Sequence, residues 1–314
     1  MVGSIREYIM SKEVDSFKEE HTFDQDLTDM LPRVSAFRRF SRVLIGRKVV
    51  LFGLIVILVT IITAFFAPYI APYDPNEQNL TQTLLQPSRD HLLGTDALGR
   101  DTLSRLIFGT RPSLIVGIVA IGIAATIGMM MGLVAAYFGG MTHTIIMRFI
   151  DAMMAFPMLL LALVIAALLG GGLRNVVIAL GIGLIPSYSR LMCAQALTVK
   201  QNDYITSQRA MGSSNLRIML LHILPNCFPP LIVLVTMMLG MTILLEASLS
   251  FLGVGISPPT AAWGAMVADG YKYLTSHPVL SFAPGVAMML VVFAFNMVGD
   301  GLRDALDPRL RGIL

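Results

Sequence analysis

Long stretches without aspartate, glutamate, lysine or arginine recur along the whole chain. Such charge-free intervals separate Lys48 from Asp74, Arg111 from Arg148, Asp151 from Arg174, Arg174 from Arg190, Arg217 from Glu246 and Lys272 from Asp300. A helix needs about 20 apolar residues to cross the bilayer core, and a spanning segment must bond its own backbone groups internally, which favours helices. The sequence therefore predicts an all-α integral membrane protein with six spans, at 49–68, 113–137, 152–169, 176–193, 228–250 and 280–299.

The composition agrees with this class, because 55% of the residues are hydrophobic and only 14% are charged, far from the balance of a soluble domain. The fourth predicted span is interrupted by Gly181, Gly183 and Pro186. A net charge of +3 gives no case for nucleic acid, since no basic stretch is interleaved with aromatic residues.

The placement of lysine and arginine predicts the orientation, because these residues favour cytoplasmic loops. Six of them lie directly before the first span, between residues 33 and 48: Arg33, Arg38, Arg39, Arg42, Arg47 and Lys48. Six crossings return the C-terminus to the same side and also place the bridge at 194–227 inside. The 69–111 loop, with four arginines and five acidic residues, would lie outside. We therefore expect both termini in the cytoplasm.

The first 48 residues have mixed charge and no apolar run, so they predict a cytoplasmic tail and no cleavable signal. Cys193 and Cys227 both fall on the predicted inner side. There we expect reduced thiols and no disulfide.

Several kinds of chemistry lack their sequence signals. None of the five lysines follows a glycine, so the chain has no P-loop for nucleotide phosphates. The five histidines are scattered and no cysteine cluster accompanies them, so no zinc site is indicated. No GxSxG motif is present. The sequence thus predicts a non-catalytic protein without bound cofactor or metal, and any energy for transport would come from another chain.

The polar bridge between the fourth and fifth spans contains the most informative pattern. Its central part, from Asp203 to Asn226, reads DYITSQRAMGSSNLRIMLLHILPN. We expect a surface helix over 198–211, ended by Gly212 in a left-handed or close-approach conformation. Ser213 or Ser214 can cap a second helix that runs to about Leu224, and Pro225 would mark the join to the fifth span. Such a rigid projection can transmit force to or from a soluble partner.

Three further blocks combine polar and apolar residues near the predicted membrane surfaces. In residues 93–117, Asp96 can cap a helix with an Asp101–Arg105 pair, and its apolar positions indicate an amphipathic segment outside. This segment is either a plain surface helix or a contact for an external solute-binding protein. In residues 295–309, an inner-surface exit is marked by Asp300, Arg303, Asp304 and Asp307.

The block at 245–270 supplies two candidates for the translocation path or an outer gate. Glu246 is the one acid inside a predicted span, and such a residue should face the bundle interior or a watery cavity. Either a structural hydrogen bond or a substrate contact would explain it. Trp263 would serve as an interfacial anchor or as part of an outer gate.

Small residues recur every four positions in the second span. They are Ala120, Ala124, Gly128, Gly132, Ala136 and Gly140. A stripe of this kind lets two helix backbones approach closely, so it predicts a tight helix–helix seam.

The spacing of Tyr204, Ala210, Gly212, His222, Leu224, Pro225 and Asn226 resembles the cytoplasmic coupling loop of ABC-importer permeases. Together with the three blocks above, it closely resembles the C-type permease of dipeptide, oligopeptide and nickel ABC importers, over about residues 40 to 314.

This resemblance implies the type I ABC importer permease fold, N-in and C-in, in the cell inner membrane. It divides the chain into a tail (1–48), a first span with external loop (49–111), a core transmembrane domain (112–301) with a coupling loop at 197–226, and a C-terminal tail (302–314). It also implies that the coupling loop contacts an ATPase through ten residues: Asp203, Tyr204, Thr206, Arg209, Ala210, Gly212, Ser213, Arg217, His222 and Pro225.

One departure concerns the ATPase contact. The family usually has Glu-Ala-Ala where this chain has Thr206-Ser207-Gln208. The glutamate commonly meets a basic group on the ATPase, and Thr206 cannot form that ion pair. Either the pair is absent or Asp203 substitutes.

The implied partners are a second, homologous permease, two ABC ATPase subunits that bind ATP and Mg, an extracytoplasmic solute-binding protein and membrane lipid. The implied function is ATP-driven import of di- or oligopeptides. Nickel or another small solute fits the same frame. A secondary transporter and a membrane sensor or scaffold are alternatives of other classes. The near-absence of intramembrane carboxylates argues against the first of these.

Overall fold

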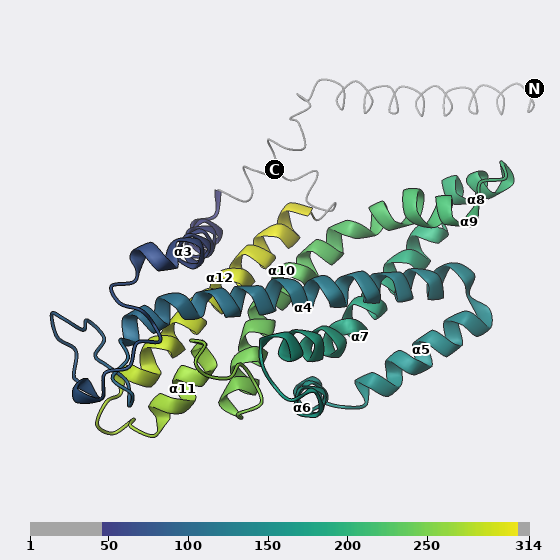
Figure 1. Ribbon diagram of the computed structural model, residues 1–314. Helices are drawn as coiled ribbons and strands as arrows, with labels where there is room; N and C mark the ends of the chain where they lie inside the picture. The colour runs from purple at the N-terminus through teal and green to yellow at the C-terminus, as the bar shows by residue number, and fades with distance from the viewer. Residues whose placement is uncertain (1–45, 307–314) are drawn as a thin grey trace, which may run out of the picture. The chain divides into compact units, whose positions relative to one another are not determined.

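The computed structural model describes residues 46–306, and this part of the chain is built from helices joined by turns and loops. In chain order these are α3 (Lys48–Ile70), the short 3-10 helix η1 (Leu80–Gln82), α4 (Thr102–Phe138), α5 (Gly140–Met154), α6 (Met158–Leu169), α7 (Leu173–Lys200), α8 (Asp203–Ala210), α9 (Asn215–Arg217), the π-helical η2 (Ile218–Ile223), α10 (Leu224–Phe251), α11 (Trp263–Tyr271) and α12 (Val279–Leu306) (Figure 1). The predicted tail at 1–45 and residues 307–314, with Asp307, lie outside the described residues.

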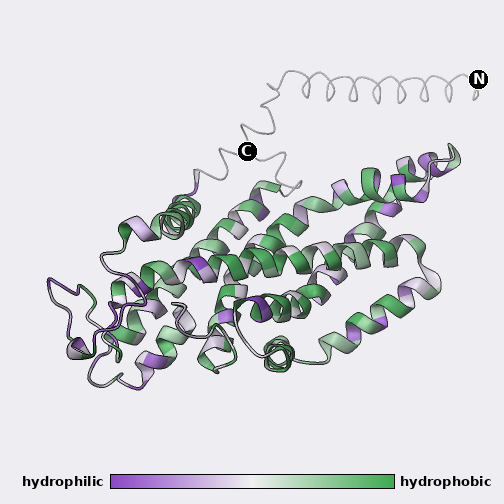
Figure 2. Ribbon diagram, viewed as in Figure 1, coloured by the Kyte–Doolittle hydropathy of each residue, from purple (hydrophilic) through white to green (hydrophobic). Residues whose placement is uncertain are grey.

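Five helical segments are long and apolar enough to cross a membrane, and a sixth span results if α5 and α6 are counted together. Figure 2 shows apolar residues along these helices, with polar residues gathered at α8 and α9 and in the loop between α3 and α4. The all-α membrane fold predicted from the charge-free intervals is therefore confirmed.

The third span differs from its prediction. Residues 152–169 were expected to form one helix, but α5 and α6 meet at an 87° bend. The break lies at Ala155–Pro157, where Pro157 is the N-cap of α6 and lacks the N–H that would continue the α5 ladder. The fourth span was expected to be interrupted, but α7 continues through Pro186 without a break.

The small-residue stripe forms the predicted seam, and its partner is α7. A Cβ atom on Gly132 would lie 2.3 Å from the carbonyl oxygen of Ser189, and one on Gly128 would lie 2.8 Å from that of Ile185. The two backbones therefore touch at positions where only glycine fits. Gly140 does not belong to the seam, since it begins α5 and has open space around it.

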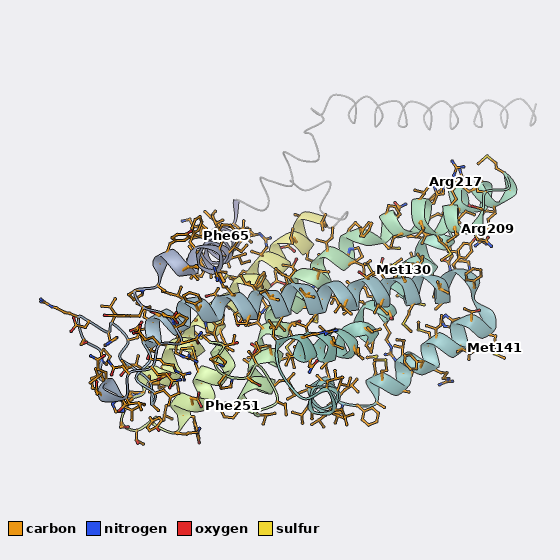
Figure 3. All side chains as sticks on the ribbon, in the orientation of Figure 1. Phe65, Met130, Met141, Arg209, Arg217 and Phe251 are labelled. Atoms are coloured by element: carbon orange, nitrogen blue, oxygen red, sulfur yellow. The ribbon has the colours of Figure 1, made fainter. Side chains whose placement is uncertain are left out.

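Helix α3 packs on α12 along one narrow stripe. Gly53 lies against the Ala294 carbonyl oxygen, and Gly301 lies against the side chain of Val50. Most other side chains of α3 are exposed and apolar, including Phe65 at 75% exposure (Figure 3). In a bilayer this surface would face lipid.

The start of α4 differs from its prediction. Asp101, and not Asp96, is the N-cap, because its carboxylate accepts from the backbone N–H of Ser104 at 2.7 Å. Asp101 also contacts Nδ1 of His91 at 2.9 Å, so it does not pair with Arg105. The helix then runs without interruption into the span, so residues 93–117 do not form a separate surface helix.

Candidate functional site

The chain between α7 and α10, residues 201–226, forms a projection that we call the elbow. Helix α7 ends at Lys200, a turn follows at Gln201 and Asn202, and α8 begins at Asp203. A single surface helix over 198–211 is therefore wrong. Gly212 has φ +79, as the prediction of a left-handed residue requires.

Two backbone hydrogen bonds close the end of α8 around this glycine. The N–H of Gly212 donates to Arg209 at 3.0 Å, and the N–H of Ser213 donates to Gln208 at 3.1 Å. This pattern is typical of a glycine-terminated helix. Ser214 then caps α9 by accepting from the backbone N–H of Arg217 at 3.4 Å, as the sequence indicated.

The expected join at Pro225 is absent, because the chain stays helical from Asn215 to Phe251. The π-helical turns of η2 lie just before α10, and they leave Pro225 in the first turn of that helix. A proline inside a continuous helix lacks the N–H of its turn, and local π-helical geometry can satisfy the backbone groups that this frees. The elbow is therefore continuous with a membrane span.

Buried apolar side chains attach the elbow to the helices behind it. Ile205 of α8 and three residues of η2 (Ile218, Met219 and Ile223) are at most 3% exposed. They belong to one core cluster with Tyr137 of α4 and Ala196 of α7. Burial of side chains of this size typically contributes about 1.5–3 kcal/mol each, which favours one fixed position for the elbow.

Polar contacts converge on Tyr137, a residue that the sequence analysis did not single out. Its hydroxyl donates to Oδ1 of Asn215 at 2.7 Å, and the Arg209 guanidinium lies 5.1 Å from its ring centroid. Lys200 Nζ donates to the carbonyl oxygens of Ala136 and Tyr137 at 3.0 and 2.8 Å, where α4 ends. The sequence offered one signal for Tyr137, which is its position as an aromatic residue at the predicted end of the second span.

The outer surface of the elbow exposes large apolar side chains beside charged ones. Tyr204, Met211, Leu216 and Leu221 are 42%, 69%, 67% and 63% exposed. Figure 3 labels Arg209 and Arg217 in this region. Exposed apolar side chains gathered at a polar end of the molecule mark an interaction surface.

The predicted coupling residues lie together on this segment. Eight of them are exposed: Asp203, Tyr204, Thr206, Arg209, Ala210, Gly212, Arg217 and Pro225. Ser213 is half-buried and donates through Oγ to Gln208 at 2.8 Å. His222 is also half-buried, and within residues 46–306 its carbonyl accepts from Asn226, while its ring has no hydrogen bond.

Glu246 is fully buried inside the chain. Ser250 Oγ donates to its Oε1 at 2.7 Å, and the backbone N–H of Ile256 donates to that same Oγ at 3.0 Å. Its other oxygen has no partner in the part of the chain that is described. These hydrogen bonds tie the end of α10 to the following loop.

Trp263 is also buried, at 3% exposure, and therefore does not present its ring to a membrane interface. Its indole Nε1 donates to the Leu106 carbonyl at 2.9 Å, and its ring lies against Gly109. The side chain wedges α11 against the first turns of α4. Leu106 and Tyr137 are far apart on α4, so α11 and the elbow lie at opposite ends of that helix (Figure 1).

Sequence reasoning missed an ion pair between α5 and α7. Arg190 donates to Oδ1 of Asp151 at 2.5 Å, and Arg148 lies 4.0 Å from the same carboxylate. Arg190 precedes the end of α7 by ten residues, or about 15 Å along a helix. The prediction placed Asp151 just outside the third span, which was expected to begin at residue 152.

A cavity of about 790 Å³ opens between α7, α10 and α12. Polar side chains of its lining include Gln195, Asn226 and Arg303. In residues 46–306, no group of three or more His, Cys, Asp or Glu side chains could hold a metal ion, and both cysteines are free and buried.

Comparison with known families adds an independent line of information. Residues 124–312 match the model of the "Binding-protein-dependent transport system inner membrane component". Residues 35–87 match the "N-terminal TM domain of oligopeptide transport permease C".

Individual proteins match over most of their length. The dipeptide transport system permease protein DppC of Haemophilus influenzae is 45% identical over 267 residues, which cover 83% of this chain and 90% of that one. The di/tripeptide transport system permease protein DppC of Pseudomonas aeruginosa is 44% identical, covering 88% and 93%. The glutathione transport system permease protein GsiD of Pectobacterium atrosepticum is 42% identical, covering 88% and 92%.

The fold also matches solved structures. Two crystal forms of the MetNI methionine ABC transporter in inward-facing conformations align with TM-scores of 0.53 and 0.54. The alignments cover 65% of this chain and 96% and 97% of those chains. At 19% sequence identity this likeness concerns the fold alone.

Proposed function

Because this chain belongs to the family of binding-protein-dependent transport system inner membrane components, we propose that it imports short peptides and that its elbow receives the motion of a separate ATPase. The family makes the chain a multi-pass permease of the inner membrane. The peptide specificity comes from relatives whose names describe dipeptide, di/tripeptide and glutathione transport.

The rigid attachment of an exposed elbow is the observation that carries this proposal. Ile205, Ile218 and Ile223 are fully buried, whereas the tip around Met211 is open. A force applied to the tip would reach α10 directly, since the helix is continuous from Asn215 to Phe251. It would reach α4 and α7 through Tyr137 and Lys200.

The surface chemistry of the elbow suits a protein partner. Met211 and Leu216 would enter an apolar cleft of the ATPase subunit, and Arg209 and Arg217 would meet acidic groups around it. Interfaces commonly combine a buried apolar centre with a charged rim. Thr206 is exposed but cannot form an ion pair, so the contact depends on these neighbours.

The chain itself contributes no catalytic group. Two ATPase subunits would bind ATP and Mg, close on each other and move the elbow. Shifting a two-state equilibrium from 1:99 to 99:1 requires about 5.5 kcal/mol of differential binding, which nucleotide held between two partner subunits can supply. The motion would open a path between this chain and a second permease, with the cavity beside Gln195 and Arg303 on its inner side.

The test replaces Gly212 by glutamate in the complete transporter, reconstituted in vesicles with its second permease, ATPases and binding protein. Gly212→Glu puts a bulky charge on the tip and strains a residue with positive φ. We expect peptide uptake to fall about ten-fold or more while ATP hydrolysis persists. The readouts are uptake of labelled peptide and phosphate release.

Gly253→Glu is the matched control. Gly253 has φ +83 and open space around it. The N–H of Gly253 donates to the Ser250 carbonyl and the N–H of Val254 to the Leu249 carbonyl, which repeats the pattern at Gly212. It lies at the other end of α10, so it carries the strain without touching the elbow. If Gly212→Glu transported peptide as well as Gly253→Glu, the coupling role would be wrong.

A further inference from the structure

A small, charged cavity lies at the end of α4 that is remote from the elbow. Its volume is about 140 Å³, and it lies between the loop before α4, the first turn of α4, and α11. Five charged side chains line it, namely Asp96, Arg100, Arg105, Asp269 and Lys272, together with Thr102. Neither the coupling role nor the translocation path uses these residues.

Two arginines of this cavity are held in place almost without exposure. Arg100 and Arg105 are 5% and 4% exposed. Arg100 Nε donates to Asp96 at 2.7 Å, and Arg105 Nε lies 3.6 Å from the same oxygen. A terminal nitrogen of Arg105 also donates to the Pro75 carbonyl at 2.9 Å. The guanidinium groups are therefore fixed before any ligand arrives.

The cavity is prepared for one more negative charge. Three cationic side chains meet two carboxylates on its walls, which leaves one positive charge in excess, while the N-terminus of α4 is already capped by the Asp101 carboxylate. Arg100 makes one side-chain hydrogen bond within the described residues, from Nε to Asp96, so its two terminal nitrogens have no partner there. Thr102 Oγ1 is buried and has no hydrogen-bond partner among residues 46–306. An anion that accepts hydrogen bonds would satisfy these groups.

We propose that this cavity receives the carboxylate of one acidic side chain from the extracytoplasmic binding protein, and that it anchors that protein on the permease. This proposal rests on the proposed function. A volume of about 140 Å³ accommodates a carboxylate-bearing side chain but lies below the usual range of about 300–1,000 Å³ for ligand pockets, so a whole peptide does not fit. The position opposite the elbow places the cavity on the outer side.

The test measures how docking depends on this cavity. The complete transporter is reconstituted in vesicles, purified peptide-loaded binding protein is titrated, and ATP hydrolysis is recorded. For Arg100→Gln, the binding-protein concentration that gives half-maximal stimulation should rise about ten-fold, because a charge-assisted hydrogen bond is lost. For Thr102→Val, which breaks no described hydrogen bond of the hydroxyl, it should rise about three-fold.

Arg89→Gln is the matched control, since it removes one positive charge from an exposed side chain of the same loop, outside the cavity. It should leave the half-maximal concentration unchanged. Sodium acetate should raise that concentration more than sodium chloride of equal ionic strength in the unaltered transporter, and this difference should vanish in Arg100→Gln.

The outcomes separate this proposal from the one on which it rests. If binding protein stimulates the unaltered transporter but Arg100→Gln and Thr102→Val both behave like Arg89→Gln, the anchoring role is overturned while the importer function stands. A half-maximal concentration that follows the anionic lipid content and not these substitutions would assign docking to the lipid surface, which also overturns the anchoring role. If binding protein does not stimulate the unaltered transporter, both proposals fall.

Discussion

Single glycines determine how closely α4 and α7 approach. Gly128 and Gly132 lie against the backbone of α7, and the neighbouring Tyr188 is fully buried. The four-residue spacing of small side chains predicted this seam, because close backbone approach requires the same residue types in any membrane helix pair. The partner helix could not be predicted, since α7 has no equally regular stripe.

Gly132→Ala should destabilise the protein. The added Cβ would lie 2.3 Å from the Ser189 carbonyl oxygen and 2.9 Å from the Cys193 nitrogen, and backbone atoms cannot move aside locally. We expect a loss of about 1–3 kcal/mol, or roughly 2–10 °C in melting temperature. A thiol-reactive dye can follow the transition, because both cysteines are buried in the folded chain.

The control for this substitution is Gly122→Ala on the same helix. A Cβ atom added to Gly122 would meet no heavy atom of another part of the chain within 4 Å. Alanine should therefore be neutral or slightly stabilising there. Equal melting temperatures for the two variants would contradict the close seam.

Asp151 and Arg190 should behave as a unit. Asp151 and Arg190 are 41% and 52% exposed, and their 2.5 Å contact joins α5 to α7, so Asp151→Asn and Arg190→Gln should each lower the melting temperature modestly. The double variant should lose less than the sum of the two, with a coupling of about 0.5 kcal/mol or more. Arg148→Gln provides a reference, because Arg148 is 81% exposed and 4.0 Å away. Strict additivity of the two losses would show that the pair is not an energetic unit.

At the scale of elements, sequence patterns predicted which segments are helical better than they predicted where helices break. Charge-free intervals located the spans, and Gly212 and Ser214 ended and began the elbow helices as their residue types require. Prolines were less informative. Pro157 accompanies a sharp bend, Pro186 lies within a continuous helix, and Pro225 follows the π-helical turns of η2. Packing against other helices, and not the proline itself, decides between these outcomes.

Leu216→Asp should weaken association of the permease with its ATPase. Leu216 is 67% exposed on α9, so the substitution costs the folded chain little, while an interface that buries this side chain would have to bury a charge instead. We expect the ATPase retained on a tagged permease to fall at least about ten-fold. Thr206→Ala, an exposed and smaller change on α8, should retain the unaltered amount. Full retention of ATPase by Leu216→Asp would exclude α9 from the contact.

At the scale of the whole molecule, the fold class, the spans and the position of the elbow could be read from the sequence, because hydropathy and helix-ending residues act locally. Contacts between distant segments could not. Tyr137 meets Asn215, Trp263 meets Leu106, and Asp96 meets Arg105 only after the chain has folded. The sequence could not show either that Glu246 and Trp263 are buried within the chain, or that Ser250 donates to Glu246.

The proposed coupling role requires the elbow to lie on the cytoplasmic side of the membrane, where an ATPase can bind it. The most direct measurement introduces Ser213→Cys and, separately, Arg89→Cys, and labels sealed cells and inverted vesicles with a membrane-impermeant maleimide. Cys193 and Cys227 are buried and contribute little background. The account predicts that Ser213→Cys is labelled only in inverted vesicles and Arg89→Cys only in intact cells. Labelling of Ser213→Cys from outside intact cells would contradict it.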